Sequence, residues 1–168
     1  MRDDDVYRAI KALILKFLPE LTPDRVVRGW NNRVPPPPGG FALMRILYHS
    51  RQATNLAEYD PPGESVTLAQ SALVVVQVDF YGARPVSMAD GWAHDVATVW
   101  RDAVACDFLA GAGVAPTMAS DPRHLPLVGG EEQYLDRWSV ELTASIFDEI
   151  KLAQAFFDDV DITLYPLE

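Results

Sequence analysis

Two groups of residues have side chains that could bind a metal ion or transfer protons. Asp90, His94 and Asp95 lie within one stretch, at spacings that place His94 near Asp90 on a helix surface. A second group shares one loop and could bind a cation: Asp121, His124, Glu131 and Glu132. Such ligand types suit metal ions only when the fold fixes their geometry, and nothing in either spacing does so. A solvated helix surface and a solvated loop or subunit contact are therefore the better interpretations.

Other patterns typical of catalysis are missing from the sequence. There is no glycine-rich phosphate loop, no nucleophile elbow and no metal motif with ligand spacing. Cys106 is the single cysteine, so no internal disulfide is possible, and we expect it to be a small residue on a helix. We predict a protein that is not an enzyme and needs no cofactor or metal. One alternative stays open, a small-ligand-binding protein or enzyme that uses the loop 121–132 with Asp79 nearby.

The net charge limits the classes of partner that the protein can bind. The formal net charge is −10, from 24 acidic and 14 basic residues. Tight binding to nucleic acid depends on Lys and Arg releasing counterions, so such a chain is a poor candidate for it. The acidic start at residues 1–5 is unlike a signal peptide, and no apolar run reaches about 18 residues. We therefore expect a protein made in the cytosol and without a membrane partner.

The elements that position these residues centre on one strand and one helix. Four valines in the five residues 74–78 favour an extended chain, so residues 66–81 are predicted to form a central strand. The helix is predicted over residues 87–108, with Ser87 as its N-cap. Trp92, Val96 and Trp100 recur at helical spacing and should pack on the sheet.

The remaining elements complete a single α+β domain over residues 1–168. A mixed, mostly antiparallel sheet is expected, packed by an N-terminal helix and one long central helix. The first helix should start at the acidic residues 3–5 and end near Phe17, because Pro19 follows. Strands are predicted at residues 25–31, 41–48, 66–81, 133–146 and 160–165, and one helical turn at 153–158.

Two segments are expected to project. Residues 33–40 contain four prolines, which stiffen the chain, so this segment is either a contact arm or a rigid linker between two strands. If residues 41–51 pair with 66–81, then residues 51–64 form a long hairpin tip. Long ordered loops are usually functional, and we expect this one to contact a protein.

Several segments, in order along the chain, resemble the neck or tail terminator proteins of long-tailed phages and prophages. The segments are residues 28–35, 76–82, 100–102, 121–127, 131–134 and 137–138. The resemblance implies a small subunit that forms a ring, typically a hexamer, on the completed tail tube. Such a ring stops tube polymerisation and offers the surface for head joining, within the virion.

The resemblance also implies the partners: further copies of the chain, the tail tube protein and head–tail connector proteins. DNA would only pass through the lumen, without specific binding, and an acidic lumen would let it slide. A head–tail connector or head-completion subunit of the same neck remains an alternative. The candidate contact residues are Arg28, Arg33, Pro35, Pro36, Pro37, Pro38, Arg51, Tyr59, Asp121, Arg123, Glu131 and Glu132.

Overall fold

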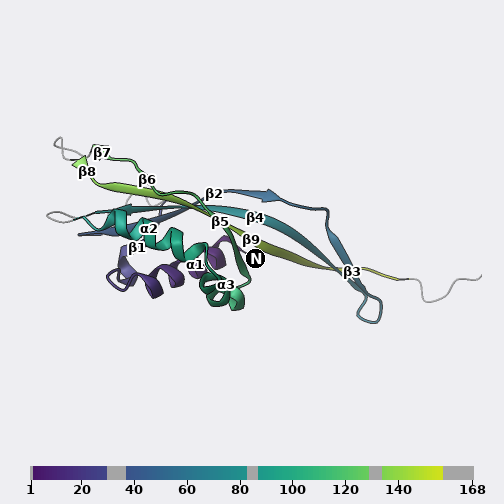
Figure 1. The fold of residues 1–168 in the computed structure, drawn as a ribbon. Helices are drawn as coiled ribbons and strands as arrows, with labels where there is room; N and C mark the ends of the chain where they lie inside the picture. The colour runs from purple at the N-terminus through teal and green to yellow at the C-terminus, as the bar shows by residue number, and fades with distance from the viewer. Residues whose placement is uncertain (1, 30–36, 83–86, 129–133, 157–168) are drawn as a thin grey trace, which may run out of the picture.

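The fold is a twisted sheet with helices on one side (Figure 1). The computed structural model describes residues 2–29, 37–82, 87–128 and 134–156. The strand predicted at 160–165 lies outside this part of the chain. The strands of the main sheet are β1 (Val26–Arg28), β2 (Phe41–Arg51), β3 (Leu56–Asp60), β4 (Ser65–Tyr81), β5 (Val114–Ala119), β6 (Arg123–His124) and β9 (Arg137–Ala153).

The sheet follows the order β1-β2-β4-β9-β5, with β3 added to β4 and β6 added to β9. Among the described strands only β1 and β2 are parallel, so the expected mixed, mostly antiparallel sheet is confirmed. The expected hairpin is also present, because β2 pairs with β4 from Phe41 opposite Tyr81 to Arg51 opposite Ala72. A separate small ribbon joins β7 (Leu127–Val128) to β8 (Tyr134–Leu135).

The helices α1 (Asp3–Phe17), α2 (Ala89–Trp100) and α3 (Ala103–Leu109) cover one face of the sheet (Figure 1). Two short 3-10 turns, η1 (Pro23–Arg25) and η2 (Ala110–Ala112), join them to strands. The core lies between the two layers. Its fully buried side chains include Ile10, Leu13, Val78, Phe80, Trp100 and Leu142. The predicted packing of Trp92, Val96 and Trp100 on the sheet is confirmed.

The prediction of one long central helix is wrong. The chain bends after Trp100, and Asp102 adopts an extended conformation, with φ −104° and ψ 157°. Its carboxylate accepts a hydrogen bond from the Val104 amide at 3.0 Å and caps a second helix, α3. Aspartate competes with the helical backbone in this way, so it favours a helix start over a helix interior. Helix α2 starts at Ala89, with Met88 in place of Ser87 at the N-cap position.

Strand β9 is longer than expected and continues to Ala153. The helical turn predicted at 153–158 is therefore wrong in its described part, where the Gln154 amide still donates to the Glu64 carbonyl. Four further strands were not predicted, and two of them, β6 and β7, are pairs of residues within the segment expected to be a loop. β3 lies within the polar tip, and β5 follows the helices, with an irregular register between Pro116 and Met118. A proline inside a short segment hides a strand from pattern analysis.

Candidate functional site

The arm of the molecule projects beyond the helices (Figure 1). We define it as β3, residues 65–70 of β4 and residues 147–153 of β9. β4 and β9 each have 17 residues and pair without a break from Tyr81 opposite Arg137 to Ser65 opposite Ala153. Because strand side chains alternate between faces, the face that is buried in the core continues along the arm without a helix over it.

Beyond a polar row of Gln70 and Asp148, the outer part of this helix-side face of the arm is apolar. One row across it consists of Tyr59, Val66 and Leu152, and the next row contains Leu68 and Ile150. Tyr59 is 59% exposed, Ile150 is 61% exposed and Leu152 is 45% exposed, whereas Val66 is buried between its neighbours. Aromatic and branched aliphatic side chains with this exposure are typical of contact surfaces when they are contiguous.

The opposite face of the arm has a different character. It is mixed, because the charged residues Glu58, Glu149 and Lys151 lie exposed on it together with two exposed apolar side chains, Leu56 and Phe147. At the arm's base, the Arg51 guanidinium donates to the Ala53 carbonyl at 2.9 Å and to Asn55 Oδ1 at 2.6 Å. Arg51 thus holds the connection into β3. The predicted tip therefore contains a strand, β3, and the outer part of the arm has one apolar and one mixed face.

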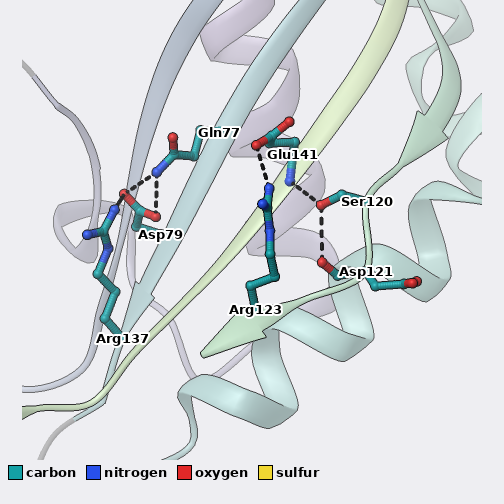
Figure 2. A network of polar contacts seen from close by, with 7 residues as sticks. All are labelled: Gln77, Asp79, Ser120, Asp121, Arg123, Arg137 and Glu141. Carbon is teal, nitrogen blue, oxygen red and sulfur yellow. Dashed lines mark hydrogen bonds and ion pairs between the residues drawn. The ribbon is translucent and has the colours of Figure 1, made fainter. Parts of the chain in front are cut away.

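A second feature lies on the helix-free face of the body, where polar side chains cross three strands (Figure 2). Asp79 is 1% exposed and accepts hydrogen bonds from Gln77 Nε2 at 2.8 and 2.9 Å. Arg137 donates to the same carboxylate at 2.9 Å, and the Arg45 guanidinium lies 3.6 Å from it. A buried carboxylate is tolerated only with such partners, so this cluster ties β2, β4 and β9 together.

Asp121 and Arg123, both predicted contacts, lie beside this cluster (Figure 2). Arg123 pairs with Glu141 at 2.7 Å, and the Ser120 hydroxyl accepts from the Glu141 amide at 2.9 Å. Asp121 pairs with Arg101 at 2.8 Å, and this hydrogen bond and charge hold the pKa of Asp121 below its usual value. These two exposed ion pairs, Arg123 with Glu141 and Asp121 with Arg101, place charged side chains along one edge of the sheet.

The other predicted contact residues are dispersed. Arg28 pairs with Asp4 and its guanidinium lies 4.0 Å from the Tyr7 ring centre, so it holds α1 against the sheet. Pro37 is partly exposed and Pro38 is exposed. Arg33, Pro35, Pro36, Glu131 and Glu132 lie outside the described residues. Of the candidates, the structure brings Arg51 and Tyr59 to the arm, and Asp121 and Arg123 to the sheet edge.

The side chains that could bind a metal ion or transfer protons lie at the surface of the described part of the chain. His94 and Asp95 are exposed on α2, and His124 stacks on Trp138 and bonds to Asp136 at 2.9 Å. Within the described ranges, no three His, Cys, Asp or Glu side chains gather in a way that could hold a metal ion. In the same ranges, no helix has the length and apolar character needed to cross a membrane.

Comparison with known proteins decides the family. Residues 4–166 match the family model of the phage neck terminator protein. The chain belongs to this family. No curated protein matches the sequence. The predicted resemblance is confirmed, and it makes this neck terminator a structural protein of the phage neck, present in the virion and in contact with other head or tail proteins.

Sequence reasoning missed two parts of the neck terminator's surface. The partners of Asp79 were not identified, although an acidic residue inside an apolar strand signals a buried ion pair. The exposed face of the arm was also missed. Its signal was the recurrence of Ile146, Ile150 and Leu152 on one face of β9, interrupted by Asp148, beyond the predicted strand end.

Proposed function

We propose that the neck terminator forms a ring, most simply a hexamer, on the end of the completed tail tube. The ring stops tube polymerisation and provides the surface to which the head joins. The family match carries this proposal, because it covers residues 4–166 and names a neck terminator. The exposed apolar face of the arm supports it, since a protein that acts through contacts needs a surface of this kind.

The partners follow from the same role. They are other copies of the chain, the tube protein on one side and a connector protein on the other. The prolines and Arg33 of the segment 33–40, together with Glu131 and Glu132, remain proposed contacts to these partners. The net charge of −10 is multiplied in a ring, and copies tolerate this best when the carboxylates face an open channel. DNA then passes an acidic lumen without binding.

The direct test is genetic. The gene is deleted from the phage that encodes it, and lysates are imaged by negative-stain electron microscopy. We expect filled heads and separate tails, with tails of irregular and excessive length, and rescue by the wild-type gene supplied in trans. Tails of normal length that remain unjoined would indicate a connector instead. Normal-length tails that still join heads would refute the proposal.

A further inference from the structure

The helix-free face of the body has an exposed apolar band of its own. We call it the back band, and its members are Tyr48, Leu73, Val75, Met118, Thr143 and Phe147. Tyr48 is 57% exposed, Met118 is 62% exposed and Phe147 is 61% exposed. Val75 is buried although it lies outside the core between the sheet and the helices, since Tyr48 and Thr143 flank it in neighbouring strands. The described part of the chain therefore leaves a second, largely apolar surface exposed.

The back band and the helix-side face of the arm point in opposite directions. They lie on opposite faces of one sheet and at different places along β4 and β9. The arm projects beyond the helices (Figure 1). A second copy that is displaced along the strands can therefore place its back band against the arm of the first copy, where its sheet continues the layer that the helices begin. Two sheets that pack face to face lie about 10 Å apart, with their strands roughly aligned.

Neither surface has a charged side chain at its centre. Among the described residues, the helix-side face of the arm has one charged side chain, Asp148. The other charged residues of the arm lie on its opposite face or in the turn at its tip: Glu58, Asp60, Glu64, Glu149 and Lys151. The back band has none, and on its side away from the arm the first charges, Arg45 and Glu141, come one row beyond Val75. Glu141 is paired with Arg123 at 2.7 Å. Packed sheets exclude water from the faces between them, so uncharged faces suit this packing.

One pair of opposite charges matches in register. On the arm, Asp148 lies one row from Ile150, on the side toward the body. On the helix-free face, Arg45 lies one row from Val75 in the same direction along the strands. Arg45 shares the carboxylate of Asp79 with a second arginine, so this cluster has a net positive charge. Stacking Ile150 on Val75 therefore brings Asp148 to the row that contains Arg45, and opposite charges favour this register over others.

We propose that the arm of one copy packs on the back band of the next copy, with Leu152 over Leu73 and Ile150 over Val75. Both contacts form at once, because each pair of residues lies one row apart on its own sheet. The arm and the back band are different parts of one chain, so the contact is head to tail, and its repetition closes a ring when the rotation allows. Two arms face to face would instead repel, since each arm has five acidic residues against the single Lys151. This inference rests on the proposed ring and identifies the two surfaces that build it.

The first test is chemical crosslinking of a cysteine pair. Cys106 is exposed, so Cys106→Ser provides the background, into which Leu152→Cys and Leu73→Cys are introduced together. Within one chain these two positions lie on opposite faces of the sheet, so a short bis-maleimide joins them only between copies. Concentrated protein should give a ladder of covalent multimers. The matched control is Leu73→Cys with Lys151→Cys, on the opposite face of the arm, and the ladder should exceed its yield at least about tenfold.

Each outcome of the crosslinking decides the question. A ladder from the first pair alone supports packing of the arm on the back band. Dimers from Leu152→Cys alone would show an arm-to-arm contact, and dimers from Leu73→Cys alone would show a back-to-back contact; either result overturns the proposal. Monomers only, or equal ladders from both pairs, overturn it as well. Circular dichroism melting of each variant establishes that it is folded before crosslinking.

A carboxylate placed in the back band gives a second, independent test. Met118→Glu should lower the yield of the ladder at least about fivefold, because the contact would bury a charge that has no partner. The matched control is Val104→Glu on α3, which is 48% exposed outside both surfaces and should leave the yield unchanged. Equal losses in the two variants would contradict the contact. The deletion experiment above does not depend on these surfaces, so failed crosslinking with overlong deletion tails rejects the contact and retains the function.

Discussion

The body and the arm are built from the same two strands yet differ in what covers them. Ile146 and Ile150 lie on one strand and, four residues apart, on one face. Ile146 is 1% exposed beneath the helices, whereas Ile150 is 61% exposed in the arm. Apart from Asp148, the apolar residues of β9 therefore continue on one face through both regions, and the helix layer covers them in the body alone. The comparison separates residues that are buried in the core from residues that the same strand leaves exposed.

Trp100→Ala should have the largest effect on the body. The indole is 1% exposed, and its Nε1 donates to the Thr143 carbonyl at 3.1 Å across the two layers. Its removal leaves a cavity and should lower the free energy of unfolding by about 3–5 kcal/mol. Urea denaturation followed by circular dichroism measures this. An unchanged midpoint would mean that the helices do not determine the stability of the sheet.

Alanine substitutions of Ile146 and Ile150 test the comparison of the body with the arm most closely. Ile146→Ala should lower the free energy of unfolding by about 2–5 kcal/mol, because a fully buried side chain is lost. Ile150→Ala should change it by less than about 0.5 kcal/mol, as surface substitutions usually do. The two variants share residue type, strand and face, so each is the control for the other. Equal losses would show that the arm is part of the cooperative core.

Asp79→Ala examines the helix-free face of the body. It leaves Arg137, which is mostly buried, without its 2.9 Å carboxylate partner. An unpaired group of this kind should cost about 1–3 kcal/mol of unfolding free energy. Arg123→Ala, at an exposed ion pair nearby, should cost at most about 1 kcal/mol. If the two variants unfold at the same urea concentration, the Asp79 cluster is not what ties the strands together.

The smallest effect is expected at the Asp4–Arg28 pair, which joins α1 to β1. The hydrogen bond and the charge of Arg28 hold the pKa of Asp4 below its usual value. The stability from this shift is present above the usual aspartate pKa and is lost as the pH falls through the lowered value. Asp4→Asn should therefore weaken the dependence of the melting temperature on pH below about pH 4. Asp107→Asn, on the exposed face of α3, is the control and should leave this dependence unchanged.

The sequence predicted the parts whose patterns are local. The four valines at residues 74–78 predicted β4, and the helical spacing of Trp92, Val96 and Trp100 predicted that they are buried in the core. The break at Asp102 could not be predicted in the same way, because it depends on one cap hydrogen bond that competes with an uninterrupted apolar stripe.

The exposed apolar face of the arm could not be predicted, for a different reason. Exposure at Ile150 and Leu152 depends on where the helix layer ends, which is a property of the whole fold. The partners of Asp79 come from three strands and are likewise invisible in a local pattern. Of the candidate contacts, Tyr59 was predicted from its place in a projecting tip, and the structure puts it on the apolar face of the arm.

We expect the exposed face of the arm to serve assembly and to contribute little to folding. The most direct measurement supplies the double variant Ile150→Asp with Leu152→Asp to the gene-deleted phage and records tail lengths by electron microscopy. We expect a folded subunit with an unchanged melting temperature, and overlong tails without heads. Normal-length tails joined to heads would contradict it.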